Sequence, residues 1–449
     1  MKKTPLNAVV ADVRGNIFEL EGYQAVGMSG EAFSLLTPDQ TVPTPFGTEF
    51  MYLPQRKPIL YNLEKKELEI LSQNPYAPGE PIFPVAAFNS PGYVVSHLCA
   101  YQEENNAKPL PLFSYGAVGW KKGRFRSSAI LVDRERRQDL RKMRITDVRA
   151  QVKKLRKQLR GNRLREHLEI CALVYGCPAG KNFFLGRYEA PLPTSRTCNA
   201  GCLGCISLQK EKTIPCTQNR IAFIPSSDEI AEIALFHIHR ARNPVVSFGQ
   251  GCEGEPLLAA HVIEPAIKII RKKTRRGTIN LNTNAGRPKI LKQLLEAGLD
   301  SIRVSINSFQ EKYYNAYFRP RSYRFGDVIK SIESALSAKK FVSINYLNSP
   351  GFTDSSREVK ALFQFLTSYP IHYIQWRNLN YDPIRYRKTV WKDFHPGETM
   401  GMKALLEHIQ DSFPHIRYGY FNPPKEKFRR FPGFLNPYFS PQPDGKPLK

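Results

Sequence analysis

The sequence predicts an α/β fold in which a partial barrel of about six β/α units follows a β-rich N-terminal domain. From about residue 185, strand-like and helix-like segments alternate regularly, as a parallel sheet with crossover helices requires. Before about residue 130, short strand-like runs are broken by turns and many prolines, which is typical of an irregular β domain. The length of 449 residues also favours more than one domain.

The N-terminal part is expected to form a β-rich domain over residues 1–130, with strands at 8–13, 16–20 and 49–53. A basic helical linker is expected over residues 131–184. Eighteen Lys or Arg and only four Asp or Glu lie between residues 121 and 165, and apolar residues recur there at three- and four-residue steps. One face of this helix should therefore pack, while the other is basic.

The barrel itself is expected over residues 185–400. A capping box at residues 226–229 predicts the start of one helix, and further helices are predicted from about residues 257, 288, 327 and 355. Strands are predicted just before residue 195 and at 245–248, 278–282, 301–306, 341–346 and 372–377. About six units are too few to close an eight-stranded barrel, so we expect an open barrel with its ligands at the carboxyl ends of the strands.

The remaining segment, residues 401–449, is predicted to hold a C-terminal helix and a basic tail. Residues 413–449 contain eight prolines and nine aromatic residues, and we expect no regular elements there. Such a tail would wrap the surface or contact a partner.

Composition limits the classes of function. The net charge of +26 attracts polyanions such as nucleic acids or acidic surfaces. Eight cysteines are too few for a disulfide framework and indicate metal or redox chemistry in a reducing compartment. The sequence shows neither the apolar core of a signal peptide nor an 18-residue apolar run, so we expect a cytoplasmic protein without a membrane partner.

Three cysteines carry the strongest chemical signal. Cys198, Cys202 and Cys205, here called the cysteine triplet, have the spacing C-x3-C-x2-C on a glycine-containing loop. A cubane iron–sulfur cluster needs four ligands, so three thiolates leave one iron open for reaction. A structural zinc site completed by a remote Cys or His, or a redox pair of Cys202 and Cys205, are the alternatives.

This loop, at the first strand end of a β/α series, resembles the signature of the radical S-adenosylmethionine (radical SAM) superfamily, and the resemblance covers about residues 185–400. It implies a partial (β/α)6 barrel in which the cysteine triplet holds a [4Fe-4S] cluster and S-adenosyl-L-methionine chelates the open iron. It further implies reductive cleavage of S-adenosyl-L-methionine to a 5′-deoxyadenosyl radical, which attacks a substrate. The electron would come from a reductant such as flavodoxin or ferredoxin.

Two further sites match the family in chain order. The segment Gly254-Glu255-Pro256 is similar to the family's Gly-Gly-Glu segment, which implies that the Glu255 carboxylate accepts hydrogen bonds from the methionine ammonium. Gly204 stands just before the third cysteine, where the family usually has an aromatic residue, so only backbone contact with adenine is implied.

Three polar positions at strand ends extend the resemblance. Asn284 lies in a segment similar to the family's Thr-Asn-Gly stretch. Ser305 and Asn307 end the fourth strand, where the family binds ribose hydroxyls or the carboxylate of S-adenosyl-L-methionine. Taken alone, such residues are ordinary helix caps and turn residues.

The other cysteines and the substrate stay open. Cys171, Cys177 and Cys216 could ligate an auxiliary cluster, but free cysteines are often small buried hydrophobes. Cys252 could serve as a hydrogen donor or a substrate anchor, or it could simply pack. The charge, the basic helix and the tail favour RNA as the substrate, with a protein, a peptide or a small molecule as alternatives. A non-catalytic iron–sulfur or zinc protein that binds nucleic acid is the non-enzymatic alternative.

Overall fold

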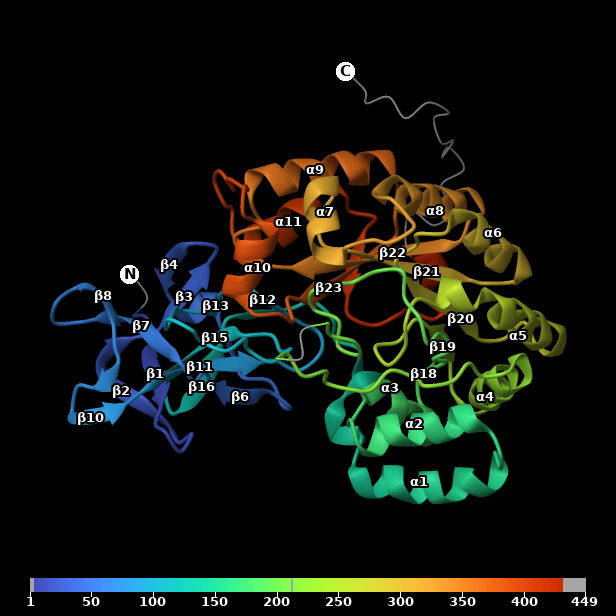
Figure 1. The fold of residues 1–449 in the computed structure, drawn as a ribbon, viewed down its shortest axis with the longest axis horizontal. Coiled ribbons are helices and arrows are strands. Elements are labelled where there is room, and N and C mark those ends of the chain that lie inside the picture. The colour runs from blue at the N-terminus through green and yellow to red at the C-terminus, as the bar shows by residue number, and fades with distance from the viewer. Residues whose placement is uncertain (1–3, 211–212, 431–449) are drawn as a thin grey trace.

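A computed structural model describes residues 4–210 and 213–430. The predicted tail beyond residue 430 therefore lies outside the described residues. Figure 1 shows an antiparallel β region at one end of the molecule and a curled parallel sheet with helices at the other, with helices α1 to α3 beside the first strand of the parallel sheet.

The N-terminal region is rich in β structure, as predicted. Most of its strands join one 13-stranded sheet with antiparallel pairing, in which β1 lies between β2 and β11. The strands are β1 (Asn7–Ala11), β2 (Ile17–Gln24), β3 (Val26–Ser29), β4 (Ala32–Leu35), β5 (Val42–Pro43), β6 (Glu49–Tyr52), β7 (Arg56–Asn62), β8 (Glu67–Ile70), β9 (Gln73–Asn74), β10 (Ala77–Pro81), β11 (Phe83–Phe88), β12 (Tyr93–Val95), β13 (Leu98–Cys99), β14 (Tyr101–Glu103), β15 (Gly116–Lys121), β16 (Arg124–Ser127) and β17 (Ala129–Leu131).

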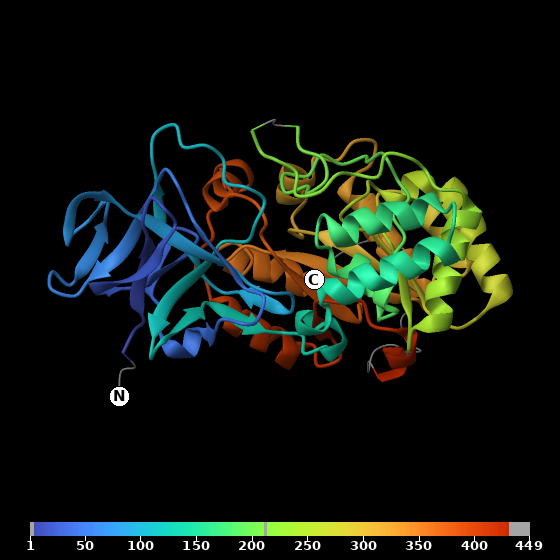
Figure 2. The same cartoon turned by 90° about the horizontal axis from the view of Figure 1, so that it is seen from below.

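Three helices follow: α1 (Ile145–Gln158), α2 (Arg163–Leu173) and α3 (Pro178–Leu185). Helix α1 has the predicted amphipathic character, because Val148, Val152 and Leu155 are buried while its Lys and Arg side chains are exposed. Figure 2 shows α1 and α2 lying side by side over one end of the molecule.

The parallel sheet confirms the predicted partial barrel. Its seven strands lie in sequence order and every neighbouring pair is parallel. The strands are β18 (Glu189–Pro191), β19 (Val245–Phe248), β20 (Thr278–Thr283), β21 (Ser301–Ile306), β22 (Phe341–Asn348), β23 (Tyr373–Asn378) and β24 (Arg417–Gly419). The helices of this part are α4 (Ser227–Arg240), α5 (Ala260–Lys273), α6 (Pro288–Ala297), α7 (Glu311–Phe318), α8 (Phe325–Ser337), α9 (Ser356–Ser368), α10 (Pro383–Val390) and α11 (Met402–Ser412).

The two faces of the parallel sheet differ in polarity. Side chains of the apolar face, such as Val304, belong to the large buried core under the helices. The other face carries Ser305, Asn345 and Gln375, which lie in register on β21, β22 and β23. Because alternate residues of a strand point to opposite faces, these three side chains share one side of the sheet. We call it the polar face.

The C-terminal segment differs from the prediction. Residues 417–419 form β24, which pairs with β23, and Lys425–Arg430 form a 3-10 helix, so the prediction of no regular elements is wrong there. Two contacts explain the order: the Tyr418 hydroxyl donates to the Leu406 carbonyl at 2.8 Å, and the Phe428 ring stacks on Phe341 at 4.2 Å. Aromatic residues of this segment therefore hold it against the sheet, although its composition predicted no regular elements.

The N-terminal region reaches the carboxyl ends of two barrel strands. Asn378, the last residue of β23, accepts from the Val95 N–H and donates to the Tyr93 carbonyl, both at 2.8 Å. Asn348, the last residue of β22, donates to the Val95 carbonyl at 2.6 Å. Strand β12 therefore borders the mouth of the barrel. Among the described residues, no helix is both long enough and apolar enough to cross a bilayer.

Candidate functional site

The cysteine triplet lies on the loop that leaves the first strand of the parallel sheet. The three side chains are half-buried and their thiols are free. The backbone N–H of Gly201 donates to the Phe318 carbonyl at 2.9 Å, and the N–H of Leu203 donates to the Tyr317 carbonyl at 3.1 Å. These bonds attach the loop to the end of α7.

The turn after β19, residues 249–256, packs against the segment that precedes the cysteine triplet. The N–H of Gly254 donates to the Ser195 carbonyl at 2.7 Å, and the N–H of Glu255 donates to the Thr197 carbonyl at 2.9 Å. A Cβ atom on Gly254 would lie 1.9 Å from the Thr197 carbonyl oxygen. Only glycine allows this approach, which fixes the 249–256 turn beside the cysteine triplet.

Glu253 holds these two segments together, a role that the sequence did not reveal. Its buried carboxylate accepts from four backbone N–H groups, those of Thr194, Ser195, Gly249 and Gln250, at 2.5 to 2.9 Å. Burial raises the pKa of Glu253 to about 7, although these donors oppose the rise. An acidic residue in a glycine-rich turn is the only signal that the sequence offers for it.

Glu255 lies between the 249–256 turn and the end of β20. Its buried carboxylate accepts from the N–H of Asn284 at 2.8 Å, from the N–H of Leu257 at 3.1 Å and from the Thr283 hydroxyl. Burial raises the pKa of Glu255 to about 7. The Asn284 side chain donates to the Asn199 side-chain oxygen at 2.8 Å. The structure thus brings Glu255 and Asn284 together with the loop of the cysteine triplet.

Ser305 and Asn307 lie one strand further along. Ser305 is half-buried on the polar face, whereas Asn307 is buried and donates from Nδ2 to the Tyr313 carbonyl at 3.0 Å. Within the described part of the chain, several amide atoms near these positions are buried without a hydrogen-bond partner. They are Asn199 Nδ2, Asn282 Nδ2, Asn307 Oδ1, Asn345 Oδ1 and Gln375 Oε1. Buried polar atoms normally have partners, so a row of unpartnered ones suits a polar ligand such as S-adenosyl-L-methionine.

Gly204 has a structural explanation that the sequence did not supply. A Cβ atom there would lie 2.7 Å from Asn380 Oδ1 and 2.8 Å from the Tyr317 hydroxyl. The Asn380 side chain also donates to the Gly204 carbonyl at 2.9 Å. The space beside the third cysteine is therefore filled by side chains from α7 and from the segment after β23.

The donor chemistry of the cysteine triplet fits a cluster better than a single ion. Desolvation raises the pKa of Cys198 to about 11 and that of Cys202 well above its ordinary value, so both thiols need a metal to ionise at neutral pH. The Arg220 guanidinium lies 3.6 Å from Cys205 Sγ. Among the described residues, the one set of three ligand atoms mutually within 4.8 Å lies elsewhere.

The comparison with protein families finds one match that covers this arrangement. Residues 192–364 match the family model of the Radical SAM superfamily. This segment of the chain is therefore similar to the radical SAM superfamily. Enzymes of this superfamily cleave S-adenosylmethionine through an iron–sulfur cluster, and their cofactors are a [4Fe-4S] cluster and S-adenosylmethionine. The comparison with curated proteins finds no significant match.

Solved structures of radical SAM enzymes show a distant similarity. Native anSMEcpe with bound AdoMet is 19% identical, with a TM-score of 0.34, over 43% of this chain and 52% of that one. Streptococcus suis SuiB bound to its precursor peptide SuiA is 13% identical, with a TM-score of 0.37, over 62% of this chain and 57% of that one. HydG from Carboxydothermus hydrogenoformans is 13% identical, with a TM-score of 0.36, over 66% of this chain and 73% of that one. The chain spans about half the length of the first two structures.

Proposed function

We propose that this chain is a radical SAM enzyme in which Cys198, Cys202 and Cys205 hold the [4Fe-4S] cluster, and that its substrate is RNA. The observation that carries the first part is the pair of backbone hydrogen bonds between the 249–256 turn and residues 195–197. Through them the thiols and the Glu255 carboxylate occupy neighbouring strand ends. When bound, the cluster supplies the electron for reductive cleavage of S-adenosylmethionine.

The residues around the cysteine triplet are suited to hold S-adenosylmethionine. We assign Glu255 to the methionine ammonium, since a buried carboxylate gains most from a cationic partner. Asn284, Ser305 and Asn307 supply polar atoms for the ribose and the carboxylate. The backbone of Gly204 is the contact for adenine, because Tyr317 and Asn380 fill the position where a side chain would stand.

We further propose the division of the chain into a β-rich domain (1–130), a helical linker (131–184), the barrel (185–400) and a C-terminal helix with its tail (401–449). A reductant such as flavodoxin or ferredoxin is the expected electron donor. The eight free cysteines support a reducing, cytoplasmic location.

The basic surface of α1 supports RNA as the substrate. Arg149, Lys153, Lys154 and Lys157 are exposed on α1 away from its buried stripe, and Arg160 is exposed just beyond the end of the helix. Cationic side chains spaced along one surface neutralise successive phosphates of a nucleic acid.

A second basic feature lies close to the start of the barrel. A surface hollow is lined by Arg136, Arg137, Lys142 and Arg187. The hollow adjoins the amino end of β18, whereas the cysteine triplet follows the carboxyl end of that strand. An RNA that reaches both sites would therefore extend along the side of the barrel that α1 to α3 cover.

The test of the RNA proposal is binding as a function of salt. The double variant Lys153→Glu and Lys157→Glu should weaken RNA binding and reduce the slope of log K against log salt by about 2. The matched control is Lys289→Glu and Lys292→Glu, which makes the same charge change on the exposed side of α6.

Three results would separate the alternatives. RNA that binds with the expected slope and stimulates formation of 5′-deoxyadenosine supports the proposal. Equal loss of affinity in both double variants would show that only the net charge attracts RNA. Stimulation by a peptide or a small molecule, and not by RNA, would overturn the substrate assignment and leave the cluster assignment standing.

A further inference from the structure

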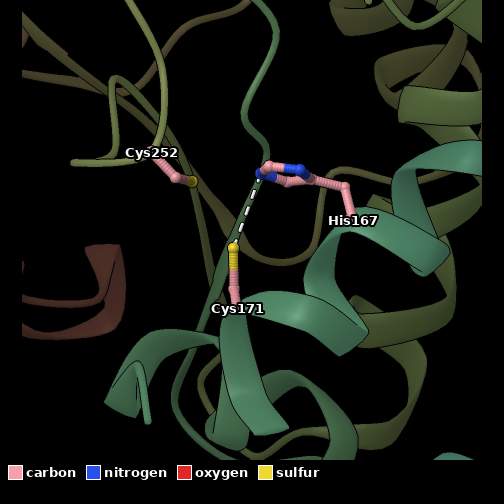
Figure 3. Close-up of side chains that lie close together, drawn as sticks. All are labelled: His167, Cys171 and Cys252. Carbon is pink, nitrogen blue, oxygen red and sulfur yellow. Dashed lines mark hydrogen bonds between the residues drawn. The ribbon is translucent and has the colours of Figure 1, made fainter. Parts of the chain in front are cut away.

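A second group of metal-ligand side chains lies outside the cysteine triplet. His167 and Cys171 stand one turn apart on α2, and Cys252 comes from the 249–256 turn (Figure 3). The ligand atoms of these three residues all lie within 4.8 Å of one another, and His167 Nε2 is 3.5 Å from Cys171 Sγ. Helix geometry places residues i and i+4 on one face, so both α2 side chains are directed toward the same point.

The backbone around this group is held firmly. The Cys252 carbonyl accepts from the Ile221 N–H at 2.8 Å, and the neighbouring Glu253 is fixed by its four backbone donors. Cys171 and Cys252 are 1% and 4% exposed. The three ligand atoms therefore meet in one small region between α2 and the 249–256 turn.

The chemistry of this group favours one soft ion. Two sulfurs and one imidazole nitrogen within 4.8 Å can reach a single centre, whereas the ligands of a cubane cluster bind separate irons. Thiolate and imidazole together, in a reducing compartment, select zinc over hard cations.

We propose that His167 Nε2, Cys171 Sγ and Cys252 Sγ bind one Zn²⁺ ion. The site is separate from the proposed cluster and goes beyond the proposed function. The zinc ion would connect α2 to the turn that carries Glu253 and Glu255. Zinc would then stabilise the 249–256 turn against the helical segment, as structural zinc sites do in small folding units.

The test measures metals in the full-length protein. The protein is purified anaerobically with reductant and without chelator, and zinc and iron are counted per chain in the wild type and in Cys171→Ser, Cys252→Ser and His167→Gln. Cys99→Ser is the matched control, because Cys99 is also a buried free thiol but lies in the N-terminal sheet. A second measurement avoids substitution: zinc-depleted wild-type protein is titrated with Co²⁺, whose absorption bands report tetrahedral thiolate coordination.

The expected result is about one zinc per chain in the wild type and in Cys99→Ser, with loss of most of it in the Cys171, Cys252 and His167 variants. Zinc should also remain in the variant with the cysteine triplet changed to alanine, which separates this site from the cluster. Three results would overturn the proposal: absence of cobalt–thiolate bands, loss of iron instead of zinc in Cys171→Ser, or a Cys171–Cys252 disulfide in the reduced, anaerobic preparation.

Discussion

The close approach of Gly254 to Thr197 provides a sharp test of how the site is built. In Gly254→Ala the new Cβ would start 1.9 Å from the Thr197 carbonyl oxygen and 2.5 Å from its carbonyl carbon. These are backbone atoms, so relief requires the two segments to separate by more than about 1 Å. That movement breaks the bonds from Gly254 to Ser195 and from Glu255 to Thr197. Leaving such groups buried without partners costs roughly 1 to 3 kcal/mol each, or roughly 2 to 6 kcal/mol in all.

The assay is denaturant unfolding of the full-length variant, followed by S-adenosylmethionine binding to the reconstituted protein. Gly201→Ala is the matched control, because a Cβ on Gly201 meets no atom closer than 3.4 Å although it lies in the loop of the cysteine triplet. We expect a clear loss of stability and of ligand binding in Gly254→Ala and little change in Gly201→Ala. Equal stability and equal ligand binding in the two variants would refute the proposed contact between turn and loop.

Three further predictions concern the cluster, the fold and the third-cysteine position. Cys202→Ala should lose the cluster iron, and full retention of iron would remove Cys202 from the ligand set. Burial lowers the pKa of His237 to about 4, so the unfolded state binds the proton at a higher pH than the folded state does. The free energy of unfolding should therefore fall by up to roughly 3 kcal/mol as the pH drops from about 6.5 through 4. His237→Gln should flatten this pH dependence and His239→Gln, on the exposed side of the same helix, should not; an unchanged slope in His237→Gln would contradict this. Gly204→Ala should cost about 1 to 3 kcal/mol, because the new Cβ would meet two side chains, Asn380 and the Tyr317 hydroxyl, and no backbone atom closer than 3.4 Å. A cost at the upper end of that expected for Gly254→Ala would mean that neither side chain can move.

Local sequence signals predicted the parallel sheet well, because residues near the ends of each strand and helix indicate where that element begins and ends. The Ser226 capping box does open α4, and the predicted bounds of β19, α6 and β21 agree with the structure. Helix α7 was not predicted, although its buried aromatic residues recur at four-residue steps, because the helix spans only eight residues. Strand β24 was missed because its order comes from pairing with β23, which is a tertiary contact.

The candidate site was likewise predictable only where its signals are local in the sequence. The spacing of the cysteine triplet is local and could be read from the sequence, whereas Glu253 acts on residues some sixty positions away, such as Thr194. The grouping of His167, Cys171 and Cys252 depends on the packing of α2 against the 249–256 turn. No local signal in the sequence indicates that α2 and the 249–256 turn contact each other. Glu255, Asn284, Ser305 and Asn307 stay predictions as ligand contacts.

The most direct test of the central claim is anaerobic reconstitution with iron and sulfide, followed by dithionite and S-adenosylmethionine, with 5′-deoxyadenosine measured by chromatography. We predict about four irons per chain in the cluster and product formation that depends on each member of the cysteine triplet. Iron and product that persist in the alanine variants of all three cysteines, or zinc in place of iron at the triplet, would contradict the account.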